Sequence, residues 1–223
     1  MWIAAVPVIV AGALAWSDGR PPDVLLALLT LAGSALMQVI TNLQNDVGYT
    51  VRRAETGGRV GLPRATSNGW LSVRAVRRAI VAAAALTVLV GLPLVLHSGL
   101  PVLLLGLSSM AAALAYMGGR WPIAYTPLGE AVVFLFFGPA AVAGSYFVFA
   151  GAVTPLVVAA SAVVGAHAAA VLAVNNHRDA EHDVRTGRRT FAAVYGAAAG
   201  RRMYGALVLS PYALCIGMAM FSG

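Results

Sequence analysis

The sequence predicts an all-α integral membrane protein, a polytopic bundle of transmembrane helices whose charged residues gather on one side of the bilayer. Sixty per cent of the 223 residues are hydrophobic and only 10% are charged, whereas a soluble domain carries roughly a quarter charged residues. The mean hydropathy is +0.81. A chain so poor in charge cannot cover a water-facing surface, so lipid is the expected solvent.

Seven apolar segments divide the chain, and each is long enough, or nearly so, to cross a bilayer as a helix of about 20 residues. They span 2–17, 24–43, 76–96, 100–117, 128–149, 153–174 and 202–221. The first is short and lacks the basic start of a signal peptide, and further spans follow it, so we expect it to be a membrane span. Short polar breaks alternate with longer, charged ones.

The arginines gather on one side of these spans. With seven spans, the longer breaks at 44–75, 118–127 and 175–201 fall on the same face. That face, with its helix ends, carries fourteen of the fifteen arginines, and only Arg20 lies opposite. By the positive-inside rule this face is cytoplasmic, and the N-terminus lies inside as well. The net charge of +7 therefore reflects membrane topology, and we expect no nucleic-acid partner.

The first candidate site is the sequence Asn42-Leu-Gln-Asn45-Asp46, at the inner end of the second span. Asn42 and Asp46 are four residues apart, so on a helix they share a face. Such a pair at the membrane edge is costly unless it has a partner, which favours a functional role. The alternative is a helix-end cap beside a basic loop.

The second candidate site runs from Asn175 to Asp183, where the chain leaves the sixth span. Asn175, Asp179 and Asp183 recur every four residues, which predicts one helix face with an amide and two carboxylates. Oxygen ligands at this spacing suit Mg²⁺, which binds through one or two carboxylates and the oxygens of a bound phosphate. A solvated, charged helix end is the alternative. Two such segments on one face predict a single site between two half-bundles.

Arginines follow both acidic segments: Arg52, Arg53, Arg59 and Arg64 after the first, and Arg185, Arg188 and Arg189 after the second. Carboxylates, a hard metal ion and guanidinium groups together form a receptor for a multiply charged anion, of which diphosphate is the natural candidate. Membrane topology alone is the competing explanation for about half of these arginines.

A third stretch, from Tyr116 to Glu130, carries aromatic residues on the remaining inner loop. Aromatic faces near a pocket can stabilise a developing carbocation by cation–π attraction. An aromatic belt at the membrane interface is the alternative interpretation.

Three blocks of sequence resemble the UbiA superfamily of intramembrane prenyltransferases, and within it the 1,4-dihydroxy-2-naphthoate prenyltransferases of menaquinone synthesis. The blocks are NLQNDVGYTVRRAETGGRVGLPR at 42–64, YMGGRWPIAYTPLGEAVVFLFFG at 116–138 and NNHRDAEHDVRTGRRT at 175–190. The resemblance implies Mg²⁺-dependent transfer of a polyprenyl group from its diphosphate to 1,4-dihydroxy-2-naphthoate, at the cytoplasmic face of a bacterial cytoplasmic membrane. Another aromatic acceptor, or a non-catalytic relative that binds isoprenoid diphosphate, is the alternative.

The resemblance also implies roles for individual residues. Those expected to act in catalysis and to bind Mg²⁺ are Asp46, Asp179 and Asp183. Those expected to bind the diphosphate are Asn42, Asn45, Asn175, Asn176, Arg52, Arg59, Arg64 and Arg178. Those expected to line the pocket for the acceptor or carbocation are Tyr116, Tyr125 and Glu130.

Two features depart from the family's pattern. Tyr49 stands where the family usually has a second aspartate of the first motif, and Glu55 is the nearest later carboxylate. The family usually has nine spans, so residues 1–223 are expected to form a single UbiA-like domain that lacks the last two helices, with the two Asp-rich loops as a cytoplasmic cap.

Overall fold

The computed structural model describes residues 2–54 and 63–221, and all the regular structure in these ranges is helical, as the sequence predicts. In chain order the elements are α1 (Trp2–Ser17), α2 (Val24–Val51), α3 (Val73–Ser98), α4 (Leu100–Met117), η1 (Ile123–Tyr125), α5 (Gly129–Leu135), η2 (Phe136–Ala143), α6 (Gly144–Ala150), α7 (Pro155–Arg178), α8 (Ala180–Arg185) and α9 (Phe191–Phe221).

Every predicted span lies on a helix. Five helices are long and apolar enough to cross a membrane: α2, α3, α4, α7 and the continuous helical stretch Gly129–Ala150, which comprises α5, η2 and α6. α1 is apolar but has only 16 residues. α9 is interrupted at Gly196, whose φ of 84° lies in the left-handed region. The protein is therefore an all-α membrane bundle, and the count of seven spans stays a prediction for α1 and α9.

Polar side chains mark where three of the long helices begin. The side chain of Asp23 accepts a hydrogen bond from Leu26 N (3.0 Å) at the start of α2, and Ser72 Oγ accepts one from Ala75 N (3.1 Å) at the start of α3. Thr154 caps α7 in the same way, with Pro155 at its first position. Each cap satisfies a backbone N–H that has no partner within the helix, which fixes the helix start.

The middle of the bundle is built on close contacts between small residues. α7 buries an alanine-rich face against η2, and a Cβ atom on Gly138 would lie 2.5 Å from Ser161 O and 2.9 Å from Gly165 Cα. The two backbones can approach this closely only because both positions are glycine. η2 is a π-helical segment with Pro139 inside it. A proline has no N–H for the regular ladder, which accounts for a local widening of this kind.

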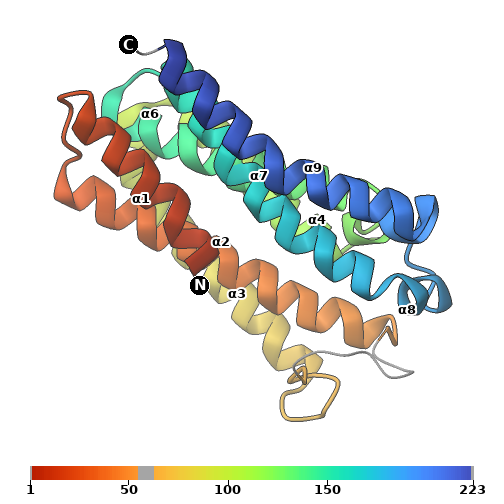
Figure 1. Cartoon of the computed structure of the whole chain (residues 1–223). Helices are drawn as coiled ribbons and strands as arrows, with labels where there is room; N and C mark the ends of the chain where they lie inside the picture. Colours follow the sequence, from red (N-terminus) through yellow and green to blue (C-terminus); the bar gives the residue numbers. More distant parts are fainter. Residues whose placement is uncertain (1, 55–62, 222–223) are drawn as a thin grey trace.

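The long charged connections meet at one end of the bundle. The end of α2, the start of α3 and the short helix α8 lie together there (Figure 1), and we call this region, residues 42–54, 63–78, 117–130 and 175–190, the charged end. At the opposite end Arg20 Nη1 donates to Ala150 O (3.1 Å), and the hydroxyl of Tyr146 donates to Asp18.

The close contact of η2 with α7 leads to a prediction about stability. Gly138→Ala should lower the free energy of unfolding by about 1–3 kcal/mol, because its methyl group overlaps backbone atoms of α7. The measurement is thermal unfolding of the detergent-solubilised protein. Gly33→Ala is the matched control, since nothing lies within 4 Å of its added methyl group, and it should leave stability equal or slightly higher. Equal effects of the two changes would contradict the packing described above.

Candidate functional site

The first acidic segment lies inside α2. The helix continues to Val51, beyond the predicted span end at residue 43, so Asn42 and Asp46 are helical residues and not a helix-end cap. Asp46 accepts hydrogen bonds from Ala65 N (3.1 Å), from Thr66 N (3.0 Å) and from the Thr66 hydroxyl. This carboxylate therefore holds the start of the stretch 63–72 against α2.

The amides of the first segment are only partly used. Asn42 Oδ1 accepts a hydrogen bond from Gln38 Nε2 (3.0 Å), while the buried Asn45 Oδ1 has no partner among the described residues. Asn45 therefore retains an oxygen that could contact a ligand.

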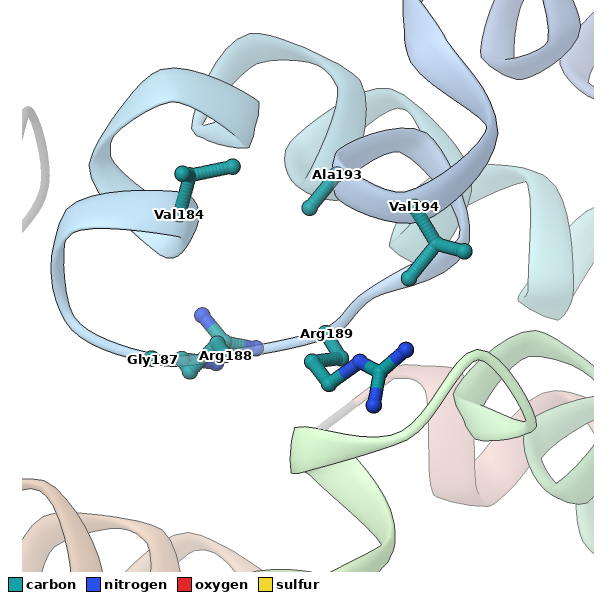
Figure 2. A pocket seen from close by; sticks show the side chains of 6 residues that line it. All are labelled: Val184, Gly187, Arg188, Arg189, Ala193 and Val194. Atoms are coloured by element: carbon teal, nitrogen blue, oxygen red, sulfur yellow. The ribbon is translucent and has the colours of Figure 1, made fainter.

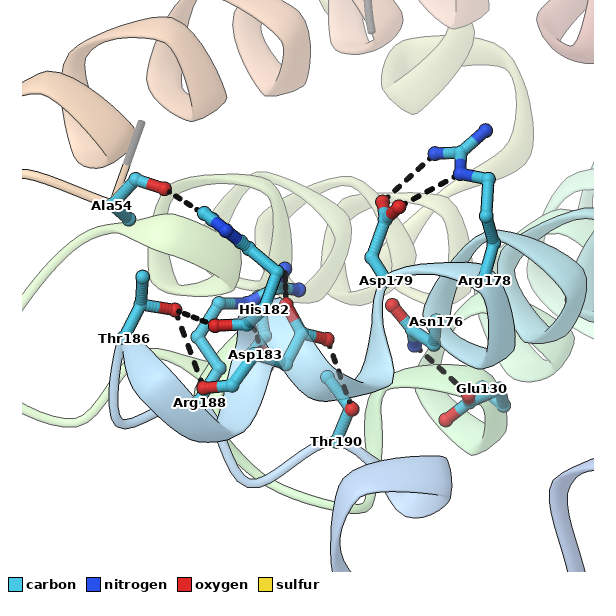
Figure 3. Close-up of polar contacts among 11 residues, drawn as sticks. Ala54, Glu130, Asn176, Arg178, Asp179, His182, Asp183, Thr186, Arg188 and Thr190 are labelled. Carbon is cyan, nitrogen blue, oxygen red and sulfur yellow. Dashed lines mark hydrogen bonds and ion pairs between the residues drawn. The ribbon is translucent and has the colours of Figure 1, made fainter. Parts of the chain in front are cut away.

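The second acidic segment is not one continuous helix face, in contrast to the prediction. α7 ends at Arg178, Asp179 lies at the junction (φ −93°, ψ 6°), and α8 begins at Ala180. Backbone bonds still link Asp179 N to Asn175 O (3.0 Å) and Asp183 N to Asp179 O (2.8 Å). The break nevertheless separates the two carboxylates, which have different partners (Figure 3).

Asp179 remains partly accessible. It accepts two hydrogen bonds from Arg178, from Nε at 2.7 Å and from Nη2 at 2.8 Å. The side chain of Arg178 is 48% exposed, whereas that of Asp179 is 12% exposed. Asn175 lies half-buried one turn before Asp179. These three predicted residues therefore stay near one another at the end of α7.

Asp183, in contrast, is fully buried. It accepts hydrogen bonds from Arg188 Nη1 (2.7 Å) and from Thr190 Oγ1 (3.0 Å), and Arg188 is buried as well. Burial raises the pKa of the Asp183 carboxyl, although the Arg188 cation and the Thr190 hydroxyl oppose the shift. The contacts assign this aspartate to the internal packing of the second segment.

Direct hydrogen bonds join the three segments of the charged end. His182 Nε2 donates to Ala54 O (2.9 Å), which connects the second acidic segment with the first. Arg52 donates to Met117 O and to Gly119 O, each at 2.6 Å.

The second acidic segment also contacts the stretch 117–130. Arg189 N donates to Tyr125 O (3.3 Å), and Arg188 Nε donates to Ala124 O (3.4 Å). Segments far apart in the sequence therefore form one site.

Guanidinium groups lie against two tyrosine rings in this site. The Cζ of Arg64 is 3.8 Å from the ring centre of Tyr49, and that of Arg188 is 5.3 Å from the same ring. Tyr125 has Arg52 at 5.5 Å and Arg188 at 5.9 Å. Burial raises the pKa of Tyr125, so its phenol stays protonated, and its hydroxyl is buried without a partner among the described residues. The site thus combines cations with aromatic faces.

Glu130 and Asn176 form a buried pair between α5 and α7. Glu130 is 5% and Asn176 is 6% exposed, and Asn176 Nδ2 donates to Glu130 Oε1 (2.9 Å). Tyr116 lies close to the start of α5, because a Cβ atom on Gly129 would be 3.6 Å from the Tyr116 hydroxyl. Asn176 was expected to bind diphosphate, but the structure directs its amide to a carboxylate.

The donor set only partly matches the expected metal site. Among residues 2–54 and 63–221, no three carboxylate, histidine or cysteine groups lie close enough together to hold a metal ion. Asp46, Asp179 and the unpartnered Asn45 Oδ1 are oxygen donors of the type that Mg²⁺ prefers, and Mg²⁺ commonly keeps few protein ligands beside phosphate oxygens and water. Asp46 and Asp179 supply oxygens of the type such an ion uses, whereas the Asp183 carboxylate is buried against Arg188.

The structure contains a cavity beside this site. It has a volume of about 300 Å³ and lies between α8 and the first turn of α9, with Arg188 and Arg189 in its wall (Figure 2). Its other lining residues are Val184, Gly187, Ala193 and Val194. The cavity is therefore polar on one side and apolar on the other.

Some functional contacts were not predicted from the sequence. Thr66 and His182 connect the segments, but no local pattern distinguishes them from their neighbours. Arg188 was expected among the arginines of an anion receptor, and the structure buries it against Asp183. Of the residues with a predicted role, Arg59 and Glu55 lie outside the described residues.

Comparison with known proteins gives a consistent family match. The profile of the UbiA prenyltransferase family matches residues 4–223. The 1,4-dihydroxy-2-naphthoate octaprenyltransferase of Escherichia coli (strain K12) is 34% identical over 213 residues, covering 93% of this chain and 69% of that protein. The Haemophilus influenzae enzyme of the same name is 31% identical over 206 residues, covering 90% and 67%. The chain thus spans about two thirds of the length of these relatives.

A solved structure shares the fold. The structure of a UbiA homolog from Archaeoglobus fulgidus bound to DMAPP and Mg²⁺ superposes with a TM-score of 0.69 and 16% sequence identity. The match covers 95% of this chain and 73% of that one. At this identity the likeness concerns the fold alone.

The buried ion pair leads to a second prediction. Asp183→Asn leaves the Arg188 cation buried without a counter-charge, so it should lower the free energy of unfolding by about 3 kcal/mol or more. Trypsin should also cut faster at the exposed Arg185 and Arg189, because α8 loses its anchor. Glu181→Gln, the same chemical change at an exposed position, is the control. Unchanged thermal unfolding and proteolysis of the Asp183 variant would rule out this anchoring role.

Proposed function

The chain belongs to the UbiA prenyltransferase family, and on that basis we propose that it transfers a polyprenyl group from its diphosphate to 1,4-dihydroxy-2-naphthoate. The observation that carries the proposal is the meeting of the two acidic segments at one end of the bundle, through the bond from His182 Nε2 to Ala54 O. Relatives that are 34% and 31% identical over most of this chain carry that activity in their names. A membrane protein with a charged end suits both substrates. The apolar prenyl tail can lie along the helices, while the polar groups of the donor and the acceptor lie at the charged end.

The proposed reaction begins with departure of the diphosphate. Breaking the allylic C–O bond leaves negative charge on the diphosphate, and a bound Mg²⁺ ion would stabilise that charge. Asp46 and Asp179, with the free Asn45 Oδ1, are the residues we propose to hold the ion. Asp183 is proposed to have an indirect role. Its carboxylate is buried against Arg188, and this contact fixes the position of the second segment.

Arginines and amides of the charged end are proposed to hold the diphosphate itself. Arg64 and Arg178 carry cations at the ends of the two acidic segments, and Arg59 is a further candidate by its place in the sequence. Asn42 and Asn175 would contribute amide groups. Arg52 has a different task, because both of its terminal nitrogens donate to backbone carbonyls of the stretch 117–119.

The aromatic residues are proposed to face the carbon end of the donor. The rings of Tyr116 and Tyr125 lie next to the segments that carry the cations. Their faces can stabilise an allylic cation once the diphosphate departs. The long isoprenoid tail would lie along the apolar helices, while the charged end faces the cytoplasm, as the arginine distribution favours.

A second candidate function is binding of isoprenoid diphosphate without catalysis. Tyr49 favours it, because this residue occupies a usual aspartate position and packs against Arg64 and Arg188. The same assay separates the two functions, since a non-catalytic relative yields no prenylated product.

The proposed function predicts a metal-dependent transfer reaction. Membranes that contain the chain, supplied with 1,4-dihydroxy-2-naphthoate, a polyprenyl diphosphate and Mg²⁺, should form prenylated product, and EDTA should abolish it. Asp46→Asn and Asp179→Asn should each lower the rate by about 100-fold or more, as loss of charge stabilisation at a leaving group does. Arg20→Gln, a charge change at the opposite end, is the control. Product formation that survives EDTA, or the absence of product from inserted protein, would overturn the proposal.

The unusual Tyr49 gives a separate prediction. Tyr49→Asp should lower the Mg²⁺ concentration needed for half-maximal rate, because it restores a carboxylate beside Asp46 in the first segment. Tyr49→Phe keeps the ring between the guanidinium groups and should leave the Mg²⁺ requirement unchanged. A Tyr49→Asp enzyme with an equal or higher requirement would show that position 49 is not close to the metal.

A further inference from the structure

A buried carboxylate with one unused oxygen lies beside the proposed site. Glu130 is 5% exposed and belongs to Gly129–Ala150, a stretch long and apolar enough to cross a membrane. Its Oε1 accepts a hydrogen bond from Asn176 Nδ2 at 2.9 Å, while its Oε2 is buried without a partner among the described residues. A buried charge with unused hydrogen-bonding capacity is costly, so its presence favours a ligand that supplies the missing donor.

The surroundings of Glu130 place it at the boundary between the polar site and the apolar helices. Asn176 directly follows Asn175 and lies three residues before Asp179, and Figure 3 shows the Asn176–Glu130 pair next to Asp179. The residue before Glu130, Gly129, lies against Leu172 and the Tyr116 hydroxyl. Glu130 therefore lies at the start of α5, next to the second acidic segment through Asn176 and one residue from a contact with Tyr116.

The charge of Glu130 decides which ligand group it can receive. A carboxylate repels a diphosphate, so its free oxygen does not suit the leaving group of the donor. It suits the O–H group of an aromatic alcohol, because a hydroxyl donates a charge-assisted hydrogen bond to a carboxylate. The arginines thus suit the diphosphate of the donor, and the carboxylate suits a hydroxyl group of the acceptor.

We propose that Glu130 Oε2 receives the hydroxyl group of the aromatic acceptor, and that Asn176 is a positioning residue that fixes the carboxylate through Oε1. This inference rests on the proposed function and extends it to the acceptor. As the ring carbon forms its new bond to the allylic carbon, the C–O bond to diphosphate breaks and its electron pair leaves with the diphosphate. The hydroxyl O–H bond breaks in the same process, its proton passes to Glu130 Oε2, and the alkylated ring is left as a neutral ketone.

A purely structural clamp between α5 and α7 is the competing explanation for the pair. A clamp affects folding and treats all ligands alike. A hydroxyl receptor distinguishes an aromatic alcohol from its methyl ether, because the ether has no proton to donate. Equilibrium binding therefore separates the two roles without any prenyl transfer.

The test compares binding of 1-naphthol and 1-methoxynaphthalene to detergent-solubilised protein. The unaltered chain should bind 1-naphthol about tenfold or more tightly, as expected for a hydrogen bond to a charged group. Glu130→Gln should lose most of this preference, and Glu181→Gln, the same change at an exposed carboxylate, should keep it. Equal affinity for the two probes in the unaltered chain, or an unchanged preference in Glu130→Gln, would overturn the inference.

A kinetic measurement links the same residue to the reaction. Glu130→Gln should lower kcat for a hydroxynaphthoate acceptor by about 10²–10⁴-fold, the usual contribution of a general base, with little change in KM for the prenyl diphosphate. If the Glu130 variant does not fold, Asn176→Ala leaves the carboxylate in place and should weaken the naphthol preference. A preference that Asn176→Ala leaves intact would contradict the positioning role. Failure of the proposed function would give a different result. The unaltered protein would then bind 1-naphthol through Glu130 but would transfer no prenyl group.

Discussion

The ion pair between Asp183 and Arg188 is the interaction on which the polar end of this bundle depends. Two buried charges lose their hydration, and the loss is offset only when the geometry and the surrounding hydrogen bonds are good. Here Thr190 donates to the carboxylate, and Arg188 also reaches Ala124 O and the rings of Tyr49 and Tyr125. One fixed guanidinium group therefore contacts all three segments of the charged end, so the segments are held in one arrangement.

This arrangement explains how a chain with so few charges can hold a polar site at a membrane surface. Most of its carboxylates are engaged: Asp46 by backbone N–H groups, Asp179 by Arg178 and Asp183 by Arg188. Among the buried carboxylates that the structure describes, Glu130 keeps its second oxygen without a partner. Cations concentrate where a diphosphate is proposed to bind, and the free carboxylate oxygen lies where an aromatic alcohol would bind. The two kinds of polar group would thereby place the diphosphate of one substrate and the hydroxyl group of the other in one site.

Much of this fold could be predicted from the sequence, because apolar length and the placement of arginine are local signals. They located every helix long enough to cross a membrane, and the Asp-rich segments marked the polar end. The break at Asp179 was missed, since the four-residue spacing on both sides matches an unbroken helix. The pairing of Asn176 with Glu130 joins residues 46 positions apart, and the bond from His182 to Ala54 spans 128. Contacts of this kind arise from tertiary packing and leave no periodic pattern.

The central claim, that the two acidic segments meet in one site, is tested most directly by cysteine cross-linking in native membranes. Cys215 is first replaced by serine, and cysteines are introduced at Ala54 and His182, whose backbone oxygen and ring nitrogen are 2.9 Å apart. The account predicts rapid cross-linking of this pair by oxidation or a short bifunctional reagent, and none between position 54 and a cysteine at Ser17, at the opposite end. No cross-link between positions 54 and 182, with both cysteines reactive on their own, would contradict it.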